Sequence, residues 1–276
     1  MIDLFNRESG LMRILVANDD GIHARGILTL AETLSEEHDV FVVAPDVEQS
    51  AMAHALTLHR PLRVKEVDLD FPVQQAFSVS GTPSDCVKIA LSVLLKGENI
   101  DLVVSGINHG PNLGCDVLYS GTVSAALEGA INGLPSIAVS LVNGGEKMAE
   151  FSHGATFIRD FLPMAVAMGF PQKSVLNVNI PAISRSEFAG VKIAELGMRM
   201  YTDTYEKRID PRGQTYYWLA GEIVDDSEEP ESDVEAIRNN MVAITPIHFN
   251  LTHHKELDQL RKNMDNILDS LLSPAP

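Results

Sequence analysis

Cysteine is scarce in this sequence, and the scarcity narrows the kinds of protein it can be. Only Cys86 and Cys115 occur among 276 residues, too few for a disulfide framework, and neither has the CxxC spacing of a zinc or redox site. The N-terminus has no charged segment followed by an apolar stretch, so it does not predict a signal peptide. Together these features favour a reducing, cytoplasmic location.

Long apolar runs and an excess of positive charge are also missing. No apolar run approaches the roughly 20 residues that span a bilayer, so we expect no membrane-spanning helix. Lysine and arginine number 21 against 38 aspartates and glutamates, a formal net charge of −17. Such a chain repels nucleic acid polymers and anionic membranes, although a small phosphorylated ligand can still bind at a locally positive point.

Several common catalytic motifs are absent. The chain has no GxxxxGK[ST] and no GxGxxG, so neither an ATP-binding P-loop nor a dinucleotide fingerprint is indicated. It also lacks the GxSxG of many esterases and the HExxH of zinc proteases.

Apolar runs that alternate with helical patterns are what the sequence does contain. Continuous β-branched runs indicate parallel strands buried on both faces. The sequence therefore predicts an α/β fold, a three-layer, Rossmann-like, doubly wound and mostly parallel sheet. The expected strands cover 13–17, 39–45, 101–106, 135–142 and 174–181, and the expected helices cover 26–37, 83–95, 122–134 and 153–169, the last bent or broken at Pro163.

The alternation of apolar runs and helical patterns ends near residue 190. We therefore divide the chain into a tail (1–11), a core (12–190) and a C-terminal part (191–276). Two extended arms around the turn signal "DPRG" predict a hairpin at about 201–223. The acidic run at 225–233 is interpreted as a solvated loop, with a cation site as the alternative. A strand at 241–247 and a C-terminal helix follow, and the helix has one apolar stripe for core packing or a subunit contact: Leu257, Leu260, Met264, Ile267 and Leu271.

Polar residues follow three of the predicted strands. Asp19 and Asp20 come directly after the first strand, Ser50 after the second, and Asn108 after the strand that ends near residue 105. In a doubly wound sheet, ligands bind beyond the carboxyl ends of the strands. Carboxylate, hydroxyl and amide oxygens are the ligands that Mg²⁺ and Mn²⁺ prefer, so we expect a divalent cation here. The alternative is that Asp20 caps the next helix and Asp19 is exposed.

Two predicted helix starts are candidate phosphate sites. Ser120, Gly121 and Thr122 begin one helix, and Gly81 and Thr82 precede another. Free N–H groups and the helix dipole favour anions at such positions. The alternative for both is ordinary N-capping by serine or threonine.

Other polar residues carry weaker signals. His54 and His109 fall near the same edge and are candidates for a phosphate contact or a proton donor, although each can equally be a surface or packing histidine. "VDLDF" at 67–71 is faintly similar to an aspartyl-phosphate motif, and we interpret it as a strand edge or turn.

Several long segments resemble the SurE family of survival-protein 5'/3'-nucleotidases. They are "RILVANDDGIHARGI", "VAPDVEQSAMAHALT", "SGTPSDCVKIAL", "DLVVSGINHGPNLGCDVLYSGTVSAALEGA" and "PSIAVS", in order, and the resemblance extends to "ITPIH" near residue 248. It implies a metal-dependent enzyme that removes phosphate from nucleoside monophosphates, and in some members from short polyphosphate.

The resemblance also implies site residues and assembly. The four metal ligands fall on Asp19, Asp20, Ser50 and Asn108, and the cofactor would be one Mg²⁺ or Mn²⁺ per subunit. Family members form homodimers or homotetramers that exchange a long hairpin, which the 201–223 segment fits. Asp19, Asp20 and Asn108 are then the expected catalytic residues. A non-catalytic nucleotide-binding or sensor protein on the same fold is the alternative.

Overall fold

The computed structural model describes residues 10–142, 150–170, 173–202, 204–221, 223–224 and 229–272. Most of the predicted tail (1–11) and part of the acidic run (225–233) lie outside the described residues.

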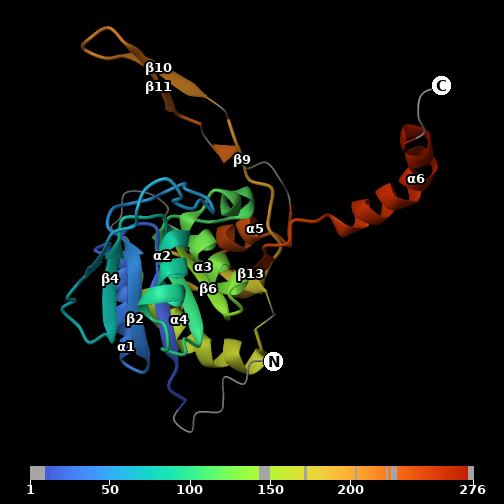
Figure 1. Ribbon diagram of the computed structural model, residues 1–276. Helices are drawn as coiled ribbons and strands as arrows, with labels where there is room; N and C mark the ends of the chain where they lie inside the picture. The colour runs from blue at the N-terminus through green and yellow to red at the C-terminus, as the bar shows by residue number, and fades with distance from the viewer. Residues whose placement is uncertain are drawn as a thin grey trace.

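A nine-stranded sheet forms the centre of the molecule (Figure 1). In spatial order its strands are β3 (Val64–Glu66), β4 (Gln75–Val79), β2 (Asp39–Pro45), β1 (Arg13–Ala17), β5 (Leu102–His109), β6 (Ser136–Val142), β7 (Ser174–Pro181), β13 (Met241–His248) and β8 (Gly190–Ile193). The six strands from β4 to β7 are mutually parallel, while β3 and β13 run antiparallel to β4 and β7. The mostly parallel, doubly wound sheet is therefore confirmed.

Helices cover both faces of the sheet. Along β1 the side chains of Leu15 and Val16 point to opposite faces, and both are fully buried. Val16 packs in the core beneath α1 (Arg25–Ser35) and α4 (Phe151–Met168), and Leu15 packs in the core beneath α2 (Pro83–Ile89) and α3 (Gly121–Ile131). Because side chains on both faces of β1 are buried, the sequence of this strand is a continuous apolar run.

Some predicted elements differ from the structure. The helix α4 is unbroken at Pro163, which lies on its exposed side. The strand β5 runs further than predicted, to His109, and its pairing with β6 shifts register between Ser105 and Asn108. The predicted helix at 83–95 is α2 followed by a π-helical turn, Ala90–Leu94. Short 3₁₀ segments occupy Gly114–Leu118 and Arg185–Glu187.

The C-terminal part contributes to the same sheet. β8 and β13 extend it beyond β7, and α5 (Asp233–Arg238) packs against them. The sheet thus crosses the boundary expected at residue 190, and the division of the chain there stays a prediction.

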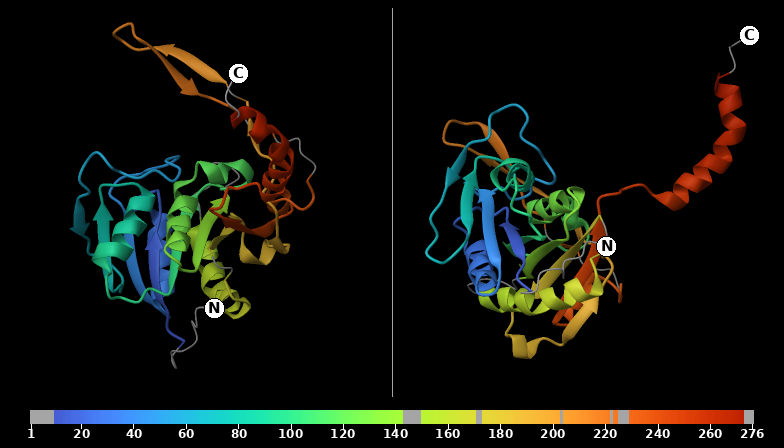
Figure 2. Two further views of the ribbon diagram at one scale, coloured as in Figure 1. Left: turned by 45° about the vertical axis from the view of Figure 1, so that its right-hand side comes forward. Right: turned by 60° about the horizontal axis from the view of Figure 1, so that its bottom comes forward.

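Two elements project from this body, as Figures 1 and 2 show: the hairpin and α6 (His254–Leu272). The hairpin pairs β10 (Tyr205–Ile209) with β11 (Thr215–Leu219), and all ten of its strand residues are exposed. At its base β9 (Met200–Tyr201) pairs with β12 (Ile223–Val224). The predicted hairpin arm and C-terminal helix are confirmed as elements. Within the described ranges, no helix combines the length and the apolar character that crossing a membrane requires.

Candidate functional site

The predicted metal ligands come from three neighbouring strands. Asp19 and Asp20 follow β1, Ser50 lies in the loop after β2, and Asn108 is near the end of β5. Because β2, β1 and β5 are adjacent and parallel, their carboxyl ends meet at one edge of the sheet. The order of the strands, which the sequence does not state, thus brings these residues to a common edge.

Asp19 is a buried carboxylate held by the start of α3. The residue is 4% exposed, and its Oδ1 accepts a hydrogen bond from the Thr122 hydroxyl. Burial raises the pKa of Asp19 to about 6, with the Thr122 bonds lowering it and the charge of Asp20 raising it. Burial therefore penalises the charged form of this group when no cation faces it.

Asp20 lies beside it and is half-buried. Its Oδ2 accepts a hydrogen bond of 3.2 Å from the backbone N–H of His109. Burial, with a smaller contribution from the charge of Glu48, raises the pKa of Asp20. In the part of the chain that the structure describes, neither Asp19 nor Asp20 has a lysine or arginine within salt-bridge distance. The pair therefore faces uncompensated repulsion.

Ser50 and Asn108 offer neutral oxygens at this edge. The Ser50 hydroxyl is exposed and donates to Glu48 Oε1 at 2.7 Å, while the neighbouring Gln49 N–H donates to the backbone carbonyl of Asp19 at 2.7 Å. Asn108 donates through Nδ2 to the Gly110 carbonyl at 2.9 Å, which orients its amide and directs Oδ1 away from that carbonyl.

The donor set fits a hard divalent cation. Among the described residues, no group of three or more histidine, cysteine, aspartate or glutamate side chains is arranged to hold a metal. The set here has two carboxylates, a hydroxyl and an amide, all of them oxygen donors that suit Mg²⁺ or Mn²⁺ better than softer metals. A cation would also relieve the repulsion between Asp19 and Asp20.

The start of α3 lies against Asp19. Ser120 is the N-cap, and its hydroxyl oxygen accepts the Val123 N–H at 3.0 Å. A Cβ placed on Gly121 would lie 2.7 Å from Asp19 Cβ and 3.0 Å from Pro83 Cγ, closer than real contacts allow. Glycine at this position therefore lets the positive end of α3 approach the carboxylate.

At the start of α2 the structure has the capping geometry that the sequence left as an alternative. Thr82 Oγ1 accepts the Asp85 N–H at 3.1 Å, and Asp85 Oδ2 accepts the Thr82 N–H at 2.9 Å. The Asp85 carboxylate thus occupies the anion position of this short helix. Phosphate binding by Gly81 and Thr82 stays a prediction, and this internal carboxylate argues against it.

The two candidate histidines are in different environments. His109 is exposed, its ring centroid 6.3 Å from that of Phe151 and its backbone bonded to Asp20. His54 Nε2 lies 3.0 Å from Glu128 Oε2, so its ring pairs with a carboxylate. Glu128 is a residue that the sequence reasoning missed, although a single charge in the apolar helix "SAALEGA" was a signal.

Glu128 is buried on α3 and also bonds the Lys88 ammonium on α2 at 2.8 Å. Burial raises the pKa of this carboxyl, but the hydrogen bonds from His54 and Lys88 outweigh it, and the net pKa is lowered. Glu128 is therefore ionised at neutral pH.

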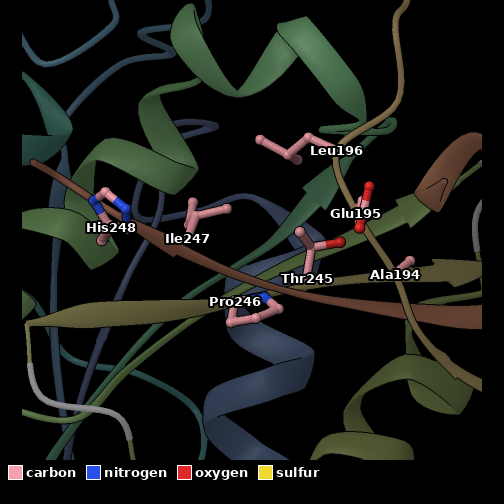
Figure 3. A pocket seen from close by; sticks show the side chains of 7 residues that line it. All are labelled: Ala194, Glu195, Leu196, Thr245, Pro246, Ile247 and His248. Carbon is pink, nitrogen blue, oxygen red and sulfur yellow. The ribbon is translucent and has the colours of Figure 1, made fainter. Parts of the chain in front are cut away.

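The remaining candidates lie elsewhere. Asp68 and Asp70 of "VDLDF" are exposed in the loop before β4, at the amino edge of the parallel strands and away from Asp19. A cavity of about 390 Å³ is lined by residues that include Glu195, Thr245 and His248, whose side chains are drawn in Figure 3. His248 pairs with Ser174, the first residue of β7, so the end of the cavity at His248 lies at the edge opposite the carboxylate pair.

Comparisons with known proteins identify relatives of this chain. The family model "Survival protein SurE" matches residues 14–203. A protein from Alkaliphilus metalliredigens named 5'-nucleotidase SurE is 50% identical over 91% of this chain and 98% of its own. A protein of the same name from Gloeobacter violaceus is 51% identical over 94% of this chain and 99% of its own.

A solved structure is similar to this chain as well. The crystal structure of a SurE protein from Aquifex aeolicus superposes with a TM-score of 0.78 at 40% identity, covering 91% of this chain and 98% of that one. The residues that the family model matches include the carboxylate pair and the start of α3. This chain therefore belongs to the SurE family.

Proposed function

We propose that this protein is a metal-dependent phosphomonoesterase that hydrolyses nucleoside 5'-monophosphates, and also 3'-monophosphates, to nucleoside and phosphate. The observation that carries the proposal is the uncompensated pair of buried Asp19 and half-buried Asp20 beside the start of α3. The relatives named 5'-nucleotidase SurE support the same activity. Short polyphosphate, which presents the same charged phosphoryl group, is a further proposed substrate.

Asp19, Asp20, Ser50 and Asn108 are the proposed ligands of one Mg²⁺ or Mn²⁺ per subunit. When bound, the cation would offset part of the charge of both carboxylates and the phosphoryl oxygens and hold or activate a water for attack. The chain's own contribution is to keep the ligands in place: the Thr122 hydroxyl holds the Asp19 carboxylate, and the His109 N–H holds that of Asp20.

The proposed phosphate cradle is the first turn of α3. Of Ser120, Gly121 and Thr122, Gly121 would present its backbone N–H, together with the helix dipole, to the phosphate beside Asp19. The Ser120 N–H is bonded to the Asp116 carbonyl at 3.1 Å, and the Thr122 N–H to the Asp19 carboxylate. Because the Thr122 hydroxyl is bonded to Asp19, its role is to position that carboxylate. Asn108 would orient the phosphoryl group, and the exposed ring of His109 is the better placed of the two histidines for proton donation.

Release of inorganic phosphate from AMP and GMP tests this function. Protein stripped of metal with EDTA should be inactive, and Mg²⁺ or Mn²⁺ should restore turnover. Binding of nucleotide with no turnover under any metal would instead identify a sensor protein. Activity that survives metal removal would contradict the proposed chemistry.

We propose that the subunits assemble as a homodimer or homotetramer through the hairpin and the C-terminal part. The hairpin exposes Tyr205, Tyr217 and Trp218 at 59–61% each. Isolated hairpins are marginal in water, and exposed aromatic clusters mark interaction surfaces. In α6, Leu260 is 58% exposed as well.

A further inference from the structure

The loop between β2 and β3, residues 46–63, has a strained turn at the proposed metal ligand Ser50. Ala51 has φ 57° and Ala53 has φ 48°, the left-handed region that residues with a side chain rarely occupy. Each such residue costs free energy and persists only where surrounding contacts enforce it. Contacts on either side of Ser50 must therefore hold this turn.

Those contacts reach the loop from two sides. Before Ser50, the Gln49 N–H donates to the Asp19 carbonyl at 2.7 Å. After it, the Ala53 N–H donates to the Tyr119 carbonyl at 2.9 Å, and the His54 ring meets Glu128 at 3.0 Å. Of these, only the contact between His54 and Glu128 joins two side chains, so substitution can remove it without changing the backbone.

Glu128 is buried, and both of its carboxylate oxygens have hydrogen-bond partners. Its side chain is 3% exposed, and α3 brings it into contact with His54, although the two residues are 74 positions apart in the sequence. The other oxygen, Oε1, accepts from Lys88 at 2.8 Å and from Asn132 Nδ2 at 3.1 Å. Figure 1 shows α2 and α3 side by side, so Lys88 ties Glu128 to the neighbouring helix and not to the loop. Oε2 of Glu128 thus contacts the loop through His54, and Oε1 contacts the helices through Lys88 and Asn132.

We infer that Glu128 is a positioning residue: through His54 it fixes the left-handed turn at Ala51 and Ala53, and so places the Ser50 hydroxyl for the cation. This inference rests on the proposed function, because it requires Ser50 to be a metal ligand. The same α3 supplies Thr122 to Asp19 from its first turn and Glu128 to His54 from about two turns further along, so one rigid helix sets both sides of the metal site.

Binding of Mn²⁺, measured by the electron paramagnetic resonance of the free ion, tests the inference without any turnover. Glu128→Ala and His54→Leu should each weaken Mn²⁺ affinity about 10-fold, the effect typical of losing an outer-shell partner. The double variant should be no weaker than either single one, because both remove the same contact. Glu128→Gln keeps an oxygen that accepts from His54 and should recover most of the affinity.

Lys88→Met is the matched control, since it removes the other partner of Glu128 and leaves the loop contact. It should bind Mn²⁺ as the unmodified protein does. Thermal unfolding and circular dichroism of each variant separate a change in metal affinity from a general loss of stability. His54→Leu changes a partly exposed side chain, so it keeps the test open if Glu128→Ala fails to fold.

Three outcomes would overturn the inference and are distinguishable from failure of the proposed function. Unchanged Mn²⁺ affinity in His54→Leu, with weakened affinity in Ser50→Ala, would show that the turn does not need the contact between His54 and Glu128. Equal losses in Lys88→Met and His54→Leu would show a general packing effect. Unchanged affinity in Ser50→Ala would remove the ligand that Glu128 is inferred to place. If the unmodified protein neither binds Mn²⁺ nor hydrolyses AMP, both the function and the inference fail.

Discussion

The hydroxyl of Thr122 donates a hydrogen bond to the carboxylate of Asp19, which lies 103 residues earlier in the chain. The contact exists because Gly121, the preceding residue, has no side chain to keep α3 away from the end of β1. It orients a carboxylate that burial alone would favour in the protonated form.

Removing this hydroxyl should weaken the metal site. Thr122→Val has nearly the same shape and leaves Asp19 without its side-chain donor, so we expect metal affinity and kcat/KM to fall about 10-fold. Thr122→Ser keeps the hydroxyl and should stay close to the unmodified protein. Titration with Mn²⁺ and AMP hydrolysis at saturating metal measure both effects. Equal values for the valine and serine variants would contradict the role given to Thr122.

A methyl group at residue 121 should displace Asp19. In Gly121→Ala the new Cβ would lie 2.8 Å from Asp19 Oδ2, so the carboxylate or the helix start must move. Misplacement of a catalytic group by about 1 Å can cost about 100-fold in rate, and we expect a loss of that order with a near-normal circular dichroism spectrum. Gly154→Ala in α4 is the control, because its added Cβ meets nothing closer than 3.3 Å. Full activity of Gly121→Ala would show that the start of α3 is not part of the active site.

Metal should control both binding and turnover of the nucleotide. A phosphate dianion about 5 Å from Asp19 and Asp20 meets about 13 kcal/mol of repulsion at an effective dielectric of about 20. Hydrogen bonds from the first turn of α3, about 1.5–3 kcal/mol each, do not offset that. Asp19→Asn and Asp20→Asn should therefore each weaken metal binding and lower activity by orders of magnitude without unfolding the protein. Wild-type rates in both variants at limiting metal would refute the proposed site.

The stability of the metal-free protein should depend on pH through Asp19. Its pKa is about 6 in the folded chain and 3.8 when unperturbed, so above pH 6 the folded state bears the cost of a buried charge. Between pH 6 and pH 4 the folded state binds the proton first, and its stability rises relative to the unfolded state. Metal-free Asp19→Asn should thus be more stable than the unmodified protein at pH 8, by about 3 kcal/mol.

This advantage should shrink as the pH falls through 6 and vanish well below the unperturbed pKa of 3.8, where both states hold the proton. Urea unfolding of the two proteins in EDTA across this range gives the difference directly, because their other titrating groups are the same. A difference that stays constant with pH would show that Asp19 is ionised at no cost.

The hairpin should hold subunits together. We expect the intact protein to sediment as a dimer or larger assembly at micromolar concentration. Replacing Tyr217 and Trp218 by serine should shift it toward monomer and leave the sheet intact, because both side chains are exposed in the isolated chain. An intact protein that sediments as a monomer would contradict this assembly.

The fold class and the edge that carries the site were readable from the sequence. Strands buried on both faces must be apolar throughout, so the run that ends at Ala17 stands out, and the residues after it, Asp19 and Asp20, must lie at a carboxyl end. The same rule placed Asn108 after a strand ending near residue 105, at this edge, and the structure has it within the last two residues of β5. These are local properties, set by spacing along the chain and by the chemistry of each residue type.

Only the tertiary structure decided what each polar group contacts. At residue 82 the sequence allowed either a phosphate or a cap, and the Asp85 carboxylate occupies the helix start. The partner of His54 is Glu128, and that of the Thr122 hydroxyl is Asp19. Such pairs depend on the position of α3 along the sheet. Close packing at Gly121 fixes that position, and sequence spacing does not.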